Sequence, residues 1–125
     1  MKKIIQTDLA PKAIGPYSQA TQVGNTVYFS GQIPLNPQTM ALVSDNFREQ
    51  AIQTFVNLEA VAKTAGGDLD KVVKLTIYLT DLTHFPIFNE VMTQYFKEPY
   101  PARTTIQITA LPMGAQVEVE ALMVV

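Results

Sequence analysis

Three charged side chains near the C-terminal end of the chain have the types and spacing that acid–base chemistry needs. Arg103 begins a strand-like run over residues 103–109, and Glu118 and Glu120 stand two residues apart among apolar neighbours in the run 116–125. A guanidinium can bind a carboxylate through two parallel hydrogen bonds, and a carboxylate can orient a water molecule or transfer a proton. A structural ion pair uses the same residue types and is the commoner case, so the residues alone leave both interpretations open.

Both runs are expected to be strands, in which successive side chains point to opposite faces. The polar faces are Arg103, Thr105, Gln107 and Thr109 in the first strand and Gln116, Glu118 and Glu120 in the second. If residues 110–114, "ALPMG", join the strands as a hairpin, both polar faces lie on one side of the sheet. We expect this side to be the one that the helices leave uncovered. Contact with another subunit there would desolvate the charges, which is unfavourable unless they are paired or used.

The N-terminal third of the chain is expected to form a hairpin. Residues 17–22 and 26–33 have strand character, and the turn residues between them include Gly24 and Asn25. Gly31 interrupts the second strand, which predicts a bulge or the close approach of another group. Tyr17 follows a Gly-Pro pair; it is either hairpin packing or, less commonly, the aromatic wall of a site.

Two helices are expected in the middle of the chain. Apolar residues recur every three or four positions over residues 46–65, with Asp45 as N-cap and a Gly-Gly pair as the stop. Residues 83–96 form the second helix, on which Asn89 is most simply a solvated residue. The strand between the helices is expected to turn Val73, Leu75, Ile77 and Leu79 to one face.

The resulting order β-β-α-β-α-β-β predicts an α+β (mixed α/β) domain that spans residues 1–125. Two helices can cover only one face of such a sheet. Tyr78, Leu122 and Val124 point away from the expected core, so the bare face also carries apolar side chains. We therefore expect another subunit to cover it.

The composition excludes several function classes. The chain has 47% hydrophobic and 16% charged residues and a formal net charge of −2, which argues against nucleic-acid binding. It has no cysteine, and its only histidine, His84, is expected to be an exposed helix residue, so no histidine metal cluster can form within one chain. The first apolar stretch is too short for a signal peptide or a membrane span, which indicates a soluble, cytoplasmic protein.

Four collinear motifs resemble the Rid (reactive intermediate deaminase) family, also called YjgF, over essentially the full chain. They are "AIGPYSQA" (13–20), "YFSGQIPLNP" (28–37), "VVKLTIYLTDL" (72–82) and "PARTTIQITALPMGAQVEVEA" (101–121). The last is the most specific, and the spacing is most similar to the archetypal RidA subgroup.

The resemblance implies a chorismate-mutase-like homotrimer, with a mixed sheet of about six strands, two helices on one face and active sites between neighbouring chains. It implies hydrolytic deamination of enamines and imines such as 2-aminoacrylate and 2-aminocrotonate, which pyridoxal-phosphate enzymes of amino acid metabolism release. The products are a 2-keto acid and ammonia. An imine is already electrophilic, so a positioned water suffices and no metal or organic cofactor is needed.

The resemblance also implies a role for each candidate residue. Arg103 would pair with the substrate carboxylate, and Glu118 would orient the attacking water or relay a proton, with Glu120 a structural neighbour. The substrate-binding candidates are Tyr17, Gly31, Asn89 and Thr105. Many relatives have cysteine where this chain has Thr105; backbone contacts survive that change, whereas thiol-based regulation does not.

Two alternatives from other functional classes remain at this point. One is a regulatory trimer that binds 2-keto acids or amino acids without turnover. The other is an endoribonuclease or translation inhibitor, since the family includes proteins so described. The acidic balance, the single histidine and the lack of a basic stripe argue against an RNA-directed role.

Overall fold

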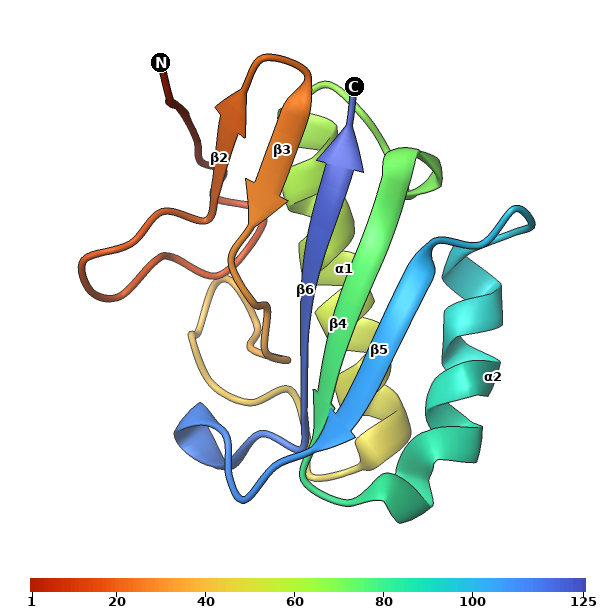
Figure 1. The fold of residues 1–125 in the computed structure, drawn as a ribbon. Helices are drawn as coiled ribbons and strands as arrows, with labels where there is room; N and C mark the ends of the chain where they lie inside the picture. Colours follow the sequence, from red (N-terminus) through yellow and green to blue (C-terminus); the bar gives the residue numbers. More distant parts are fainter.

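One six-stranded mixed sheet forms the centre of the protein in the computed structural model, which describes all residues 1–125 (Figure 1). The strands are β1 (Lys3–Ile5), β2 (Ala20–Val23), β3 (Thr26–Phe29), β4 (Val72–Leu79), β5 (Ala102–Gln107) and β6 (Val117–Val124). Their order across the sheet is β1-β2-β3-β6-β4-β5, and only the β4–β5 pair is parallel. The predicted α+β class is therefore confirmed.

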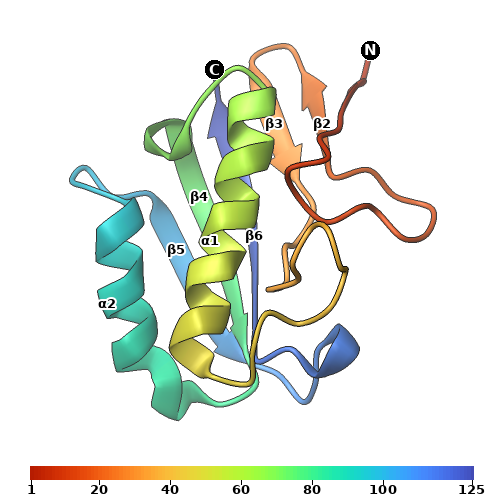
Figure 2. The same cartoon turned by 180° about the vertical axis from the view of Figure 1, so that it is seen from behind.

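Both helices lie on the same face of the sheet (Figure 2). They are α1 (Phe47–Thr64) and α2 (Phe85–Tyr95), and short 3₁₀ turns form η1 (Leu69–Lys71), η2 (Leu82–His84) and η3 (Pro112–Gly114). Phe55 of α1 and Phe88 of α2 are fully buried, with ring centroids 5.4 Å apart. This packing joins the helices to the core, and removing one such ring would destabilise the fold by about 3–5 kcal/mol.

The N-cap of α1 lies one residue later than predicted. Asn46 has extended backbone angles, and its side chain accepts a hydrogen bond from the Glu49 N–H at 3.0 Å. Asp45 is therefore not the cap; its carbonyl instead accepts from the Gln116 side chain at 2.8 Å. The stop is as expected: Gly66 follows the last turn with φ of +91°, a region that favours glycine.

The predicted inner face of β4 is correct for Leu75, Ile77 and Leu79, which are fully buried, and wrong for Val73. The register of β4 against β6 shifts between Val72 and Lys74. The irregularity turns Val72 into the core and leaves Val73 45% exposed, because one extra residue reverses the alternation of faces.

The predicted hairpin between the last two strands is wrong, because β4 lies between β5 and β6. The α2 crossover returns the chain parallel to β4, so β5 becomes the edge strand. The chain then passes the end of β4 and inserts β6 between β3 and β4.

The polar faces of these two strands consequently lie on opposite sides of the sheet. Arg103, Thr105 and Gln107 are in register with the core residues Leu75, Ile77 and Leu79, and so face the helix side. Glu118 and Glu120 are in register with Tyr78 and Thr76 on the uncovered side. The expectation that Arg103 and both glutamates share the uncovered face is thus wrong for Arg103.

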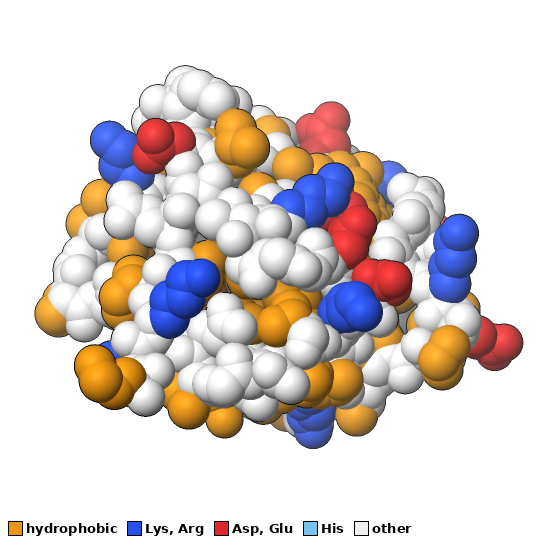
Figure 3. Space-filling model, turned by 90° about the horizontal axis from the view of Figure 1, so that it is seen from above, with side chains coloured by type: hydrophobic (Ala, Val, Ile, Leu, Met, Phe, Trp, Pro, Cys, Tyr) orange, Lys and Arg blue, Asp and Glu red, His pale blue; other side chains and the backbone are white.

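The uncovered face of the sheet exposes apolar side chains, as predicted. Tyr28 of β3 is 49% exposed and Ile106 of β5 is 42% exposed, and Leu122 and Val124 lie between them in the sheet order. Viewed from above, hydrophobic side chains reach the surface in patches between scattered charged groups (Figure 3). Neither helix has the length and apolar character that crossing a membrane requires.

Candidate active site

Three of the predicted site residues line one cavity of about 630 Å³. Glu118 lines it from the beginning of β6, Tyr17 from the segment before the β2–β3 hairpin, and Gly31 from the segment after that hairpin. The segments that flank the hairpin also supply the apolar side chains Ile14, Ile33, Leu35 and Met40, and η3 supplies Met113. The cavity thus combines one carboxylate with a largely apolar lining, the usual make-up of a small-molecule site.

Gly31 packs directly against Glu118. A Cβ atom at position 31 would lie 2.5 Å from Glu118 Oε2 and 2.6 Å from Cδ, closer than real carbon contacts. The neighbouring Gln32 exchanges backbone hydrogen bonds of 2.8 and 3.1 Å with Val119 of β6, which fixes this separation. The close approach that the sequence predicted at Gly31 is confirmed, and the approaching group is the candidate catalytic carboxylate.

The Tyr17 segment is held by a residue that the sequence reading missed. Gln19 is buried, accepts from the Thr7 N–H at 2.7 Å and donates to the Pro11 carbonyl at 2.8 Å. The Tyr17 hydroxyl accepts from the Ile14 N–H at 3.3 Å. The sequence signal for this role was a glutamine next to a loop rich in glycine and proline. The backbone of such a loop lacks regular pairing and needs hydrogen bonds from side chains.

The environment of Glu118 disfavours its ionised form. No side chain or backbone group hydrogen-bonds its carboxylate, which is half-buried on the cavity wall. Burial raises the pKa of Glu118, and the negative charge of Glu120 raises it further. The raised pKa makes Glu118 a better proton acceptor than an ordinary glutamate.

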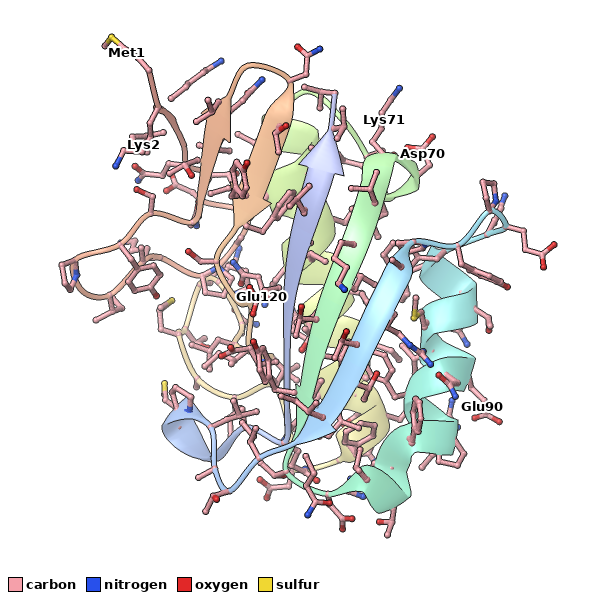
Figure 4. The ribbon with its side chains drawn as sticks, viewed as in Figure 1. Met1, Lys2, Asp70, Lys71, Glu90 and Glu120 are labelled. Carbon is pink, nitrogen blue, oxygen red and sulfur yellow. The ribbon has the colours of Figure 1, made fainter.

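Glu120 has a different environment two residues along the strand. It accepts a hydrogen bond from the Tyr78 hydroxyl, a bond that raises the pKa of Tyr78 to about 12, together with burial and the charges of Glu120 and Glu118. Glu120 lies on the sheet face that is turned away from both helices (Figure 4). It does not line the cavity.

Arg103 belongs to a second, smaller cavity of about 360 Å³ at the edge between β5 and α2. Its Nη1 donates to Asn89 Oδ1 at 2.6 Å and approaches Met92 Sδ at 3.5 Å, and its guanidinium carbon lies 5.0 Å from the ring centroid of Phe85. Its Nε and Nη2 have no partner. The guanidinium is therefore held on one side by α2, and its other edge is free for a bidentate carboxylate.

A single chain does not bring all the predicted site residues together. Tyr17, Gly31 and Glu118 share the larger cavity, whereas Arg103 and Asn89 share the smaller one. Thr105 lines neither; its hydroxyl is buried without a hydrogen-bond partner on the helix side of β5. We call the larger cavity with its three residues the Glu118 half-site, and the smaller one with its two residues the Arg103 half-site.

His84 is not the exposed residue that the sequence predicted. It ends η2 immediately before α2 and is only partly exposed, and its ring stacks on Phe47 at a centroid distance of 4.3 Å. It lines neither half-site. No group of three or more His, Cys, Asp or Glu side chains is arranged to hold a metal ion.

Residues 7–125 match the model of the Endoribonuclease L-PSP family. The chain belongs to the Rid family. It is similar to the 2-iminobutanoate/2-iminopropanoate deaminase of Dermatophagoides farinae, with 47% identity over 124 residues that cover 99% of this chain and 97% of the relative.

Solved structures of Rid-family relatives have the same fold. The crystal structure of RidA from an Antarctic Psychrobacter covers 98% of this chain and 99% of its own, with a TM-score of 0.95 and 50% identity. The structure of E. coli TdcF with bound serine covers 98% of both chains, with a TM-score of 0.93 and 40% identity. The predicted family and the two-helix, six-strand Rid fold are both confirmed.

Proposed function

We propose that this Rid-family protein hydrolyses 2-imino acids and their enamine tautomers, such as 2-aminoacrylate and 2-aminocrotonate, to 2-keto acids and ammonia. Its relative from Dermatophagoides is named for 2-iminobutanoate and 2-iminopropanoate. The observation that carries the proposal is the unpartnered Glu118 carboxylate on the wall of the larger cavity. A carboxylate without partners is free to act on a water molecule.

Arg103 binds the substrate carboxylate in this proposal. The guanidinium is oriented by Asn89 and Phe85, so little side-chain entropy is lost when its free edge takes up two carboxylate oxygens. Bound serine in the TdcF relative is a ligand of the same kind, with a carboxylate next to a carbon that bears nitrogen. Because the imine carbon is bonded to the substrate carboxylate, binding of that carboxylate by Arg103 would fix the position of the imine carbon in the site.

Glu118 moves the proton. It takes a proton from water as the oxygen attacks the protonated imine carbon, which forms the new C–O bond of a tetrahedral aminoalcohol. The protonated Glu118 then returns that proton to the amino nitrogen. The C–N bond breaks, the hydroxyl proton leaves with the ammonia as ammonium, and the carbonyl of the keto acid forms. The raised pKa of Glu118 supports the first step, because a more basic carboxylate takes a proton from water more readily.

The two half-sites meet between copies of the chain in this proposal. Arg103 and Glu118 face opposite sides of their own sheet, so one chain cannot present both to a substrate of a few atoms. A neighbouring copy on the apolar uncovered face, with Tyr28 and Ile106 at the contact, would bring its Arg103 to the Glu118 cavity. A closed ring of three copies supplies three such sites.

Mixed oligomers test this arrangement together with the activity. A serine/threonine dehydratase generates the imine, and its decay is followed with a trapping agent. Arg103→Ala and Glu118→Gln subunits are each expected to be inactive alone. Unfolded and refolded together at equal amounts, they should recover about a quarter of wild-type activity, because one interface in four joins an intact Arg103 to an intact Glu118.

The two single variants serve as controls for each other, since each is refolded alone by the same procedure. No recovery from a mixture that exchanges subunits, shown by native mass spectrometry, would contradict the shared site. An active single variant would contradict the role of that residue. Failure of the wild type to accelerate loss of either imine would favour a binding protein without turnover.

A further inference from the structure

Glu118 and Glu120 face the same side of β6, and one residue of β4 distinguishes between them. In the β4–β6 register, Tyr78 is paired with Glu118 and Thr76 with Glu120. The Tyr78 hydroxyl nevertheless donates to Glu120, its diagonal neighbour, and not to the glutamate directly opposite. Since a phenol has a single proton to donate, this choice leaves Glu118 without a donor.

The two carboxylates therefore have unequal environments. Glu120 accepts the hydrogen bond from Tyr78, whereas Glu118 has burial and a negative neighbour, which raise its pKa, and no compensating donor. Only Glu118 lines the cavity.

We propose that Tyr78 and Glu120 are positioning residues for Glu118: Glu120 takes up the single hydrogen bond of the Tyr78 phenol, which leaves the Glu118 carboxylate over the cavity as the one that exchanges the proton. The inference rests on the proposed function only because the proton that Glu118 exchanges is the one that hydrolysis requires. Neither Tyr78 nor Glu120 touches the substrate. The role explains why a second carboxylate and a phenol lie beside Glu118 on this sheet face.

Other charged and titratable groups around the pair do not replace this arrangement. On the same sheet face, Lys74 approaches Thr104 at 3.4 Å on the β5 side, and Tyr28 lies on β3. Lys12 and Tyr17 line the cavity. In the proposed assembly, Arg103 of a second copy would favour ionised Glu118. Substitutions at Tyr78 and Glu120 leave all of these groups in place. A change in the titration midpoint of Glu118 can therefore be assigned to Tyr78 and Glu120.

The test is a titration of the Glu118 side-chain carboxyl by ¹³C NMR in the complete protein, with the signal assigned from its loss in Glu118→Gln. In Glu120→Gln, the Glu118 midpoint should move to lower pH by more than the scatter among controls. Tyr78→Phe should move the midpoint in the same direction by less, because Glu120 then loses only the hydrogen bond that fixes its position beside Glu118. Tyr95→Phe and Glu98→Gln, which remove a hydroxyl and a charge away from both half-sites, should leave it unchanged.

Kinetics supply a second readout. Glu120→Gln should lower kcat for the imine about tenfold and move its pH profile in the direction of the NMR midpoint, with KM within about twofold. A Glu118 midpoint unmoved in both variants would overturn the inference, and so would a moved midpoint with an unchanged kcat profile. The NMR titration does not need turnover. An inactive wild type would therefore refute the proposed function, whereas the Glu118 midpoint would still test the effect of Tyr78 and Glu120 on Glu118.

Discussion

The two half-sites lie on strands that flank the same central strand, β4, and yet they are built in opposite ways. Arg103 sits on the edge strand, exposed to solvent, with its guanidinium held by Asn89, Met92 and Phe85. Glu118 sits on an interior strand, half-buried, with no hydrogen-bond partner.

This difference matches the tasks proposed for the two residues. A group that binds a carboxylate gains from a fixed orientation, because the loss of side-chain freedom has already occurred before the ligand arrives. A group that exchanges a proton gains from the absence of partners, because a hydrogen bond to either protonation state would favour that state. Substitutions that act on only one half-site can therefore separate binding from proton transfer.

The largest effect is expected at Arg103. Arg103→Ala should lower kcat/KM for a carboxylated imine roughly 100- to 1000-fold, since a charged pair at an interface is worth several kcal/mol. Arg48→Ala is the matched control. Arg48 pairs with Glu90 at 2.5 Å on the exposed helix surface, where such pairs contribute little, so activity should remain within about twofold. Equal losses in both variants would mean that net charge, and not the Arg103 half-site, controls turnover.

Gly31→Ala addresses the Glu118 half-site without changing any charge. The new methyl group would overlap Glu118 Oε2 and push the carboxylate aside, and a displacement of about 1 Å is enough to lower kcat 10- to 100-fold. Thermal unfolding should change little, because the overlapping atoms belong to the end of a flexible side chain. A variant with full kcat would show that the position of Glu118 is not critical.

Asn89→Ala tests the orientation of Arg103. Loss of the 2.6 Å hydrogen bond leaves the guanidinium mobile, so KM should rise about five- to tenfold while kcat stays within twofold. Gln94→Ala, an exposed position on the same helix, is the control and should behave as the wild type. A fall in kcat at constant KM would instead assign Asn89 to the reacting centre.

The raised pKa of Glu118 also predicts a pH-dependent stability. Because the folded state binds this proton more tightly than the unfolded chain, ionised Glu118 destabilises the fold at pH values above its folded pKa. Glu118→Gln should therefore raise the thermal unfolding midpoint at pH 8, and the gain should disappear below pH 4.5, the ordinary glutamate value. Glu98→Gln should show no such dependence. A Glu118→Gln gain that is equal at both pH values would contradict the shift.

The smallest effect concerns Thr105, whose buried hydroxyl has no partner. Thr105→Val removes an unsatisfied polar atom at nearly constant volume, so the free energy of unfolding should stay equal or rise by up to about 1 kcal/mol. Thr104→Val, on the opposite face beside Lys74, is the control. Chemical denaturation would measure both, and a clear destabilisation at Thr105 would indicate a hydrogen bond formed in the assembled protein.

Local features of the fold followed from the sequence with small errors. The apolar period over residues 46–65 predicted α1, and Gly66 predicted its end. The cap was placed at Asp45 and not Asn46, because both are good capping residues and only the backbone geometry distinguishes them. Val73 was placed in the core because the irregularity in β4 arises from its pairing with β6 and leaves no trace in the alternation of residue types.

The candidate site was predictable in its chemistry but not in its arrangement. The types and spacing of Arg103 and Glu118 marked both residues, and Gly31 marked a close approach that the structure contains. The hydrogen bonds from Arg103 to Asn89 and from Tyr78 to Glu120 could not be predicted from the sequence, because each joins residues of two different elements.

The sequence by itself determined which residues share a face in the regular parts of each strand, because strand alternation is a local property of the backbone. The irregularity at Val73 of β4 is the exception. It did not determine on which side of the sheet each polar face lies. That side depends on the strand order, and the order depends on the parallel crossover through α2 and the insertion of β6 beside β3. Such pairings are non-local and become favourable only when the whole core packs together, so only the tertiary structure separated Arg103 from Glu118.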